Sequence, residues 1–268
     1  MTAVVAVREG SWQEVLQLLA APTLEEETPH GTLKLDVLSA GLAFPDILQV
    51  EGKHITRRSA PFVPCSEVAG RITGIGKGVT GFTLGQRVFG SVYTGGLSAT
   101  ALMNASSAYP IPHGIADDVA AGFELNYGTA FHSIHDLASA KKGEVLLVLG
   151  ASGGVGMAAI DIGQALGLTV VACASSEAKL RACKTAGADM VIDYSVDDFK
   201  GAIQSSGIYG KIDIVVDPVG GQFSEPGTYI RLLPCQFSHH GLTCGLPACV
   251  YVCIWQRCER LDGVGALS

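Results

Sequence analysis

A glycine-rich segment at residues 151–156 carries the clearest chemical signal in this sequence. It reads Ala-Ser-Gly-Gly-Val-Gly, follows the apolar run at residues 145–149, and precedes a stretch with helical spacing. In this A-x-G-x-x-G form of the dinucleotide fingerprint, Gly153 lets the backbone approach a diphosphate and Gly156 lets the helix pack closely on the strand. Free N–H groups and the partial positive charge at the helix start would bind the phosphates. The segment predicts a dinucleotide site, and the alternative is a purely structural turn.

The residues after the next predicted strand, at 169–173, indicate which dinucleotide is bound. An NAD site places Asp or Glu about 20 residues beyond the fingerprint, where it binds the ribose 2′-hydroxyl. Here the chain has Ala174, Ser175 and Ser176, with Lys179 one turn into the next helix. A carboxylate would repel a 2′-phosphate, whereas hydroxyl groups and a lysine attract it. We therefore expect NADPH; the alternative is that Lys179 is only a solvated helix residue.

The sequence offers few residues that could bind a metal, which disfavours metal catalysis. A catalytic zinc needs three protein ligands and a structural zinc usually needs four. No cysteine lies between Cys65 and Cys173, and Glu67 has no adjacent histidine. We expect no zinc and a metal-free mechanism, and we find no Ser/His/Asp or Cys/His arrangement for nucleophilic catalysis.

Two patterns of elements would position these residues. Residues 1–120 contain short β-type runs broken by glycine turns, which predicts a small, barrel-like antiparallel domain. Residues 121–226 alternate apolar strands with helical segments, which predicts the parallel sheet of a doubly wound α/β domain. Residues 227–268 lack this alternation, and we expect them to be irregular.

Charge and hydropathy exclude several classes of protein. The formal net charge is −7 and no basic run is present, so we expect no nucleic-acid partner. No apolar segment approaches the ~20 residues of a membrane span, so we expect no membrane partner. The N-terminal residues do not read as a targeting leader. The expected location is cytoplasmic, with a mitochondrial one left open.

The order of motifs resembles the zinc-independent quinone oxidoreductases of the medium-chain dehydrogenase/reductase superfamily. The likeness runs from about Thr32 to Phe223. Besides the glycine segment and the residues around Lys179, the matching segments are Asp46–Leu48, Pro61–Pro64, Glu67–Gly70, Gly85–Val88, Tyr127–Ala130, Ala186–Asp189 and Ile192–Tyr194. The resemblance implies a GroES-like β-barrel domain followed by a Rossmann domain that is incomplete in this chain.

The resemblance also implies an activity: NADPH-dependent reduction of quinones or α,β-unsaturated carbonyls, with the small-molecule substrate in a cleft between the domains. The residues expected to bind the cofactor are Thr129, Ser152, Gly153, Gly154, Val155, Gly156, Ser175, Lys179 and Tyr194. Candidates lining the cleft are Asp46, His54 and Thr129. Two positions depart from the family pattern, because Ala43 stands where an Asn is frequent and His54 where a Tyr is common.

The resemblance stops after Phe223. Five of the eight cysteines crowd the last 34 residues, as in a spliced or misread transcript end, and we interpret the chain as C-terminally truncated. An alternative is a zinc site from this ending, although its cysteines form no C-x-x-C pairs; the residues concerned are His239, His240, Cys244, Cys249, Cys253 and Cys258. We expect an open sheet edge near Val215, an adenine half of the cofactor site that forms better than the nicotinamide half, and a weakened tendency to form homo-oligomers. The alternative function is a non-catalytic isoform that binds nucleotide or pairs with a full-length subunit.

Overall fold

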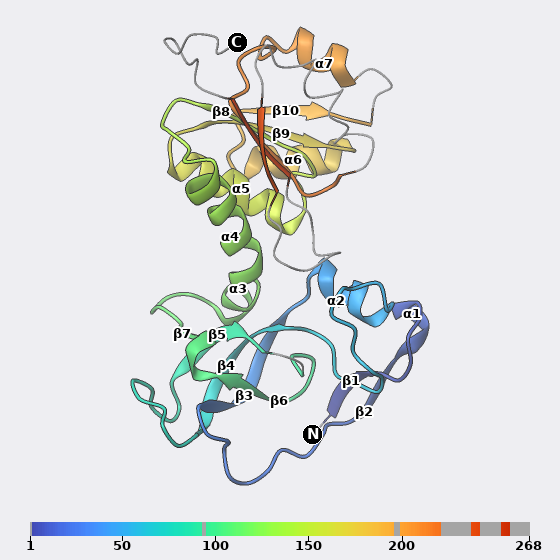
Figure 1. Ribbon diagram of the computed structural model, residues 1–268, viewed down its shortest axis with the longest axis vertical. Coiled ribbons are helices and arrows are strands. Elements are labelled where there is room, and N and C mark those ends of the chain that lie inside the picture. Colours follow the sequence, from blue (N-terminus) through green and yellow to red (C-terminus); the bar gives the residue numbers. More distant parts are fainter. Residues whose placement is uncertain (1, 93–94, 196–198, 221–236, 242–252, 258–268) are drawn as a thin grey trace, which may run out of the picture. The chain divides into compact units, whose positions relative to one another are not determined.

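The computed structural model describes residues 2–92, 95–195, 199–220, 237–241 and 253–257 (Figure 1). The chain divides into two compact units. The first contains residues 1–125, and the second begins at Asn126. The boundary expected from the sequence, after residue 120, lies five residues earlier.

The first unit is built on a five-stranded antiparallel sheet with the strand order β6-β3-β4-β5-β7. Its strands are β3 (Thr32–Gly41), β4 (Glu67–Ile75), β5 (Arg87–Ser91), β6 (Thr100–Asn104) and β7 (Ala108–Pro110). A separate hairpin joins β1 (Thr2–Ala6) to β2 (Leu16–Ala20), and the helices are α1 (Trp12–Val15), α2 (Phe44–Val50) and α3 (Asp117–Ala121). The predicted GroES-like antiparallel domain is confirmed.

The core of this sheet follows from the alternation of its strands. Leu33 and Leu35 on β3 are fully buried beside Val68 and Ile72 on β4, whereas Lys34 and Asp36 between the leucines are not buried. Side chains alternate between the faces of a strand, so every second residue enters the core.

The second unit carries a six-stranded sheet with the order β10-β9-β8-β11-β13-β12. The parallel strands are β8 (Val145–Val148), β9 (Thr169–Ala174), β10 (Met190–Asp193) and β11 (Ile214–Asp217). Its helices are α5 (Gly154–Ala165), α6 (Glu177–Thr185) and α7 (Phe199–Ser205); α4 (Glu124–Phe131) leads into the unit and continues as the π-helix η2 (His132–Leu137). The predicted Rossmann-type order of strands and helices is confirmed.

Helices cover both faces of this sheet, which explains the continuous apolar runs. Along the β8 segment, Leu146 and Val148 belong to one buried cluster, together with residues of α5 and α6. Leu147 and Leu149 belong to another, with Phe199 of α7. Strands buried on both faces have no polar alternation.

The ending of the chain differs from the sequence-based expectation. β13 (Cys253–Arg257) pairs antiparallel with β11, opposing Trp255 to Val215, and β12 (Phe237–Gly241) pairs with β13 (Figure 1). The predictions of an open edge at Val215 and of a wholly irregular ending are therefore wrong. The backbone of an edge strand offers free N–H and C=O groups that can pair with another strand. Backbone hydrogen bonds between strands form with almost any side chains. The alternation of apolar and polar residues therefore did not reveal these strands.

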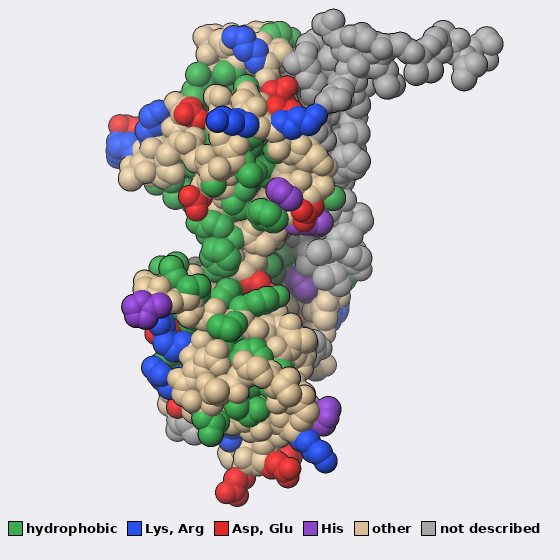
Figure 2. Space-filling view, turned by 90° about the vertical axis from the view of Figure 1, so that its left-hand side faces the viewer, with side chains coloured by type: hydrophobic (Ala, Val, Ile, Leu, Met, Phe, Trp, Pro, Cys, Tyr) green, Lys and Arg blue, Asp and Glu red, His purple; other side chains and the backbone are tan. Residues whose placement is uncertain are grey.

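Charged side chains are mixed on the face drawn in Figure 2. On the second unit, basic and acidic groups lie next to one another there rather than in a patch of one sign. Across the described part of the chain, no helix is both long and apolar enough to cross a membrane.

Candidate functional site

The glycine segment lies between the end of β8 and the start of α5. Gly150 has φ +56, in the left-handed region that glycine adopts without strain, and its carbonyl accepts the N–H of Gly153 at 2.9 Å. Gly153 is the N-cap residue and α5 begins at Gly154. The chain therefore turns sharply and points the start of a twelve-residue helix along the loop, as a diphosphate site requires.

Gly156 explains how the helix comes so close to the loop. A Cβ atom at Gly156 would lie 2.5 Å from the carbonyl oxygen of Gly150 and 2.6 Å from the Cα of Ala151, both of them backbone atoms. Gly153 is exposed, whereas Ser152 and Val155 are half-buried. The loop therefore presents its backbone to solvent at Gly153 and packs against itself at Gly156, which fits a dinucleotide diphosphate.

Three predicted residues come together at the end of β9. The Lys179 ammonium group donates to the Ser175 hydroxyl at 3.3 Å, and the Ser175 and Tyr194 side chains are hydrogen-bonded. Ser176 caps α6 by accepting the Lys179 N–H, which fixes the turn between them. Tyr194 is held by its own N–H, which donates to the Ala174 carbonyl at 3.2 Å, and burial raises the pKa of its phenol. Ser175, Lys179 and Tyr194 thus form one group of hydroxyl and ammonium donors.

The nearby acidic residues already have partners. Glu177 forms an ion pair with Arg181 one turn along α6. Asp193 accepts the hydroxyl and the N–H of Ser195 at 2.6 and 2.8 Å, and these bonds hold the pKa of Asp193 below its usual range. Neither carboxylate takes the place of the missing acidic residue after β9.

Thr129 lies on α4 in the second unit, half-buried, and its carbonyl accepts the Ser133 hydroxyl at 2.7 Å. One turn earlier on the same helix, the side chain of Asn126 lies against Gly154. Asn126 is not among the residues predicted from the sequence, because nothing in the sequence links residue 126 to residue 154.

Asp46 and His54 lie in the first unit, and both are buried. Asp46 Oδ2 accepts the Ala43 N–H at 2.9 Å and Oδ1 accepts the Ser66 hydroxyl at 3.3 Å, so the carboxylate fixes the start of α2. Burial raises the pKa of Asp46. The Nδ1 atom of His54 accepts the Thr56 N–H at 3.1 Å.

Glu67 is the most unusual acidic residue of the first unit. It is 4% exposed, and its Oε1 accepts the N–H groups of Glu124 and Leu125, the latter at 3.3 Å, at the start of α4. Its Oε2 and that of Glu124 are buried without a hydrogen-bond partner among the described residues. Burial, with the charges of Glu124 and Asp46, raises the pKa of Glu67 to about 7. Glu67 is therefore protonated in a large fraction of molecules at neutral pH.

The Cys65 thiol, two residues before Glu67, is hydrogen-bonded within its own fold. Cys65 is buried with φ +75, and its thiol donates to the carbonyls of Gly41 and Glu67 at 3.3 and 3.4 Å. Burial raises the pKa of this thiol to about 12. The alternative zinc site of the cysteine-rich ending depends on side chains that lie outside the described part of the structure.

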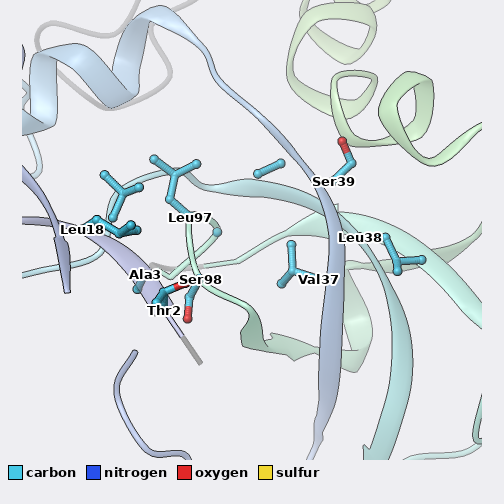
Figure 3. Close-up of a pocket in the computed structure, with 11 residues that line it drawn as sticks. Thr2, Ala3, Leu18, Val37, Leu38, Ser39, Leu97 and Ser98 are labelled. Carbon is cyan, nitrogen blue, oxygen red and sulfur yellow. The ribbon is translucent and has the colours of Figure 1, made fainter. Parts of the chain in front are cut away.

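A separate hollow of about 280 Å³ opens in the first unit between the β1–β2 hairpin and β3 (Figure 3). Leu18, Val37 and Leu97 supply apolar contacts, and Thr2, Ser39 and Ser98 supply hydroxyl groups. None of its lining residues is ionisable, and none is a predicted site residue. The hollow is distinct from the cluster around Asp46 and Glu67.

Comparison with known proteins supports both halves of the fold. Residues 29–113 match the family model of the alcohol dehydrogenase GroES-like domain, and residues 154–230 match that of zinc-binding dehydrogenases. The chain is 30% identical over 232 residues to a quinone oxidoreductase of Rattus norvegicus, covering 86% of this chain and 70% of that protein. It is also 30% identical over 203 residues to quinone oxidoreductase-like protein 2 of Bos taurus, of which it covers 58%, and 74% of this chain is matched.

Solved structures agree with these relatives. The NADPH complex of Escherichia coli quinone oxidoreductase is similar with a TM-score of 0.76 at 25% identity, over 83% of this chain and 68% of that one. For the quinone oxidoreductase of Thermus thermophilus, also solved with NADPH, the TM-score is 0.71 at 30% identity, over 87% and 70%. The chain spans little more than half of the first curated relatives it matches, 58% and 54%. With both domain models matched in order, this chain belongs to the quinone oxidoreductase-like group of the medium-chain dehydrogenase/reductase superfamily.

Proposed function

We propose that this protein is an NADPH-dependent oxidoreductase that reduces quinones or α,β-unsaturated carbonyl compounds without a metal. The observation that carries the proposal is the Lys179 ammonium group, 3.3 Å from the Ser175 hydroxyl, where an NAD enzyme has a carboxylate. Two similar quinone oxidoreductases were solved in complex with NADPH. NADPH supplies the hydride when bound.

Different residues would bind different parts of the cofactor. The loop from Ser152 to Gly156 would bind the diphosphate through its backbone N–H groups other than that of Gly153, which the Gly150 carbonyl accepts. Ser175 and Lys179 would bind the 2′-phosphate. Tyr194 would lie along the adenosine, and Thr129 would lie near the nicotinamide. With the hydride coming from the cofactor, the protein must orient two reactants and exclude water, and it needs no strong nucleophile.

The proposed roles of Asp46 and His54 are indirect. Both oxygens of Asp46 accept hydrogen bonds from the fold, so we assign it to positioning the start of α2. His54 is 7% exposed, and its Nδ1 is occupied by the Thr56 N–H, so it would act on a substrate only through its other nitrogen. Metal-free chemistry is favoured by Cys65, because its thiol donates to two backbone carbonyls of its own fold.

Equilibrium titration with NADPH and NADH tests the cofactor assignment. We expect the protein to bind NADPH more tightly, and Lys179→Ala to lower the NADPH affinity about tenfold with little change for NADH, because a bond to a charged phosphate is lost. Lys200→Ala, which removes an exposed lysine from α7 of the same unit, is the matched control and should leave both affinities unchanged. Preferential binding of NADH would contradict the proposal.

A second function is favoured by Ala43. This residue offers no side-chain donor at the start of α2, and its N–H is already given to Asp46. A protein that binds NADPH but does not oxidise it with a simple quinone or enone would be a non-catalytic, nucleotide-binding member of the group. Oxidation of NADPH that depends on the added quinone would exclude this reading.

A further inference from the structure

Asn126 lies against the first residue of α5. A Cβ atom at Gly154 would lie 2.4 Å from Oδ1, 2.7 Å from Cγ and 2.9 Å from Nδ2 of Asn126. These distances are shorter than van der Waals contact allows, so residue 154 must be glycine while Asn126 keeps this position. Both residues belong to the second unit.

The fold holds Asn126 in this place from the neighbouring turns of α4. The Tyr127 hydroxyl donates to Asp161 Oδ2 on α5 at 2.9 Å. Further along, Ala130 of α4 and Ala158 of α5 share one buried cluster. The carboxamide is therefore placed by helix packing.

The loop itself has little charge to offer a diphosphate. Residues 150–156 contain no Lys or Arg, so an anion there is neutralised by N–H groups alone. A carboxamide has two N–H donors, and one can serve an anion while the other atoms keep a partner in the protein. The Asn126 carboxamide lies beside exposed Gly154 and adds a second neutral side-chain donor to the hydroxyl of Ser152.

We propose that Asn126 is a cofactor-binding residue that donates from Nδ2 to the diphosphate, an inference that rests on the proposed function. The diphosphate is common to NADPH and NADH. Loss of Asn126 therefore weakens both dinucleotides by the same factor, whereas loss of Lys179 weakens NADPH alone.

Asn126→Asp separates binding from structure. A carboxylate at the start of α5 stabilises the helix, because it faces the positive end of the helix dipole. The same carboxylate repels a diphosphate. We expect the free Asn126→Asp protein to be at least as stable as the parent in thermal unfolding, and to bind both dinucleotides more than tenfold more weakly. Asn126→Ala should weaken both about fivefold to tenfold.

Titrations of the full chain with NADPH and with NADH test whether Asn126 binds the diphosphate. Gln204→Ala is the control, because it removes an exposed carboxamide from α7 of the same unit and should preserve both affinities. If the parent binds NADPH and both Asn126 variants retain its affinities, the inference is wrong; if the parent binds neither dinucleotide, it is the proposed function that fails. A role of Asn126 in packing alone would lower the stability of Asn126→Asp and Asn126→Ala together, and would likewise overturn the inference.

Discussion

The polar groups of the two units are used in opposite ways. In the second unit, Ser175 and Lys179 lie at the end of β9 with the lysine exposed, and the loop is exposed to solvent at Gly153. In the first unit, Asp46 and Glu67 are 5% and 4% exposed and accept N–H groups of their own fold. The second unit carries the donors of the proposed anion site, whereas the first uses its buried carboxylates at helix starts.

This difference bears on how a nicotinamide-dependent enzyme can arise on such a fold. A cofactor that carries its own hydride needs donors placed at the ends of strands, and the second unit supplies them. A buried carboxylate whose oxygens are already bonded serves structure first. Substitutions in the second unit should therefore change dinucleotide binding, and those around Glu67 should change stability.

Gly156→Ala should give the largest effect. Its methyl group would meet backbone atoms 2.5 and 2.6 Å away, so α5 must move from the loop, at a cost of about 3 kcal/mol in the free energy of unfolding. Urea unfolding measures the loss, and NADPH titration should show weakened binding in the molecules that remain folded. Gly128→Ala, on exposed α4 with no atom near the new Cβ, is the control and should raise stability slightly. Equal stability of the two variants would contradict the close approach.

Glu67→Ala should come next. It leaves the N–H groups of Glu124 and Leu125 without their acceptor, and we expect a loss of about 2 kcal/mol in the free energy of unfolding. Denaturant unfolding of the full chain measures it. Glu67→Gln keeps an acceptor oxygen at the same place and should lose less stability. If it loses as much as Glu67→Ala, the stabilisation by Glu67 does not come from accepting these N–H groups.

The pH dependence of stability should also depend on Glu67. Its pKa is raised by burial from 4.5 to about 7, so the folded protein binds a proton that the unfolded chain releases. This contribution is fully present below about pH 4.5 and is lost as the pH rises through about 7. Comparing the parent with Glu67→Gln in denaturant between pH 5 and 8 isolates it, because an amide does not titrate: the parent should lose stability relative to the variant. Parallel curves would refute the raised pKa.

Ser175→Ala should have the smallest effect. It removes one neutral hydroxyl beside Lys179 and Tyr194, so NADPH affinity should fall only about threefold while NADH affinity stays the same. Fluorescence titration with both dinucleotides measures this. A fall equal to that of Lys179→Ala would mean that the hydroxyl, rather than the ammonium group, selects the 2′-phosphate.

Local sequence patterns were sufficient for much of the fold. The run Val145–Leu149 is apolar throughout and the glycines follow it, so strand, turn and helix could be predicted in order. Lys179 lies only four residues from Ser175, and one helical turn brings such residues together. The sequence alone could therefore predict that Ser175 and Lys179 lie together at the end of β9.

Contacts between residues far apart in the sequence could not be predicted in this way. Glu67 meets the start of α4 across 57 residues, and Asn126 meets Gly154 across 28. The pairing of β13 with β11 is equally remote, and it gave the predicted open edge a partner. Glycine spacing and strand alternation in this chain fix where the backbone turns and which residues are buried. Which side chain faces which across the packed helices and sheets was decided by tertiary structure, because packing brings together residues whose local sequences carry no mutual signal.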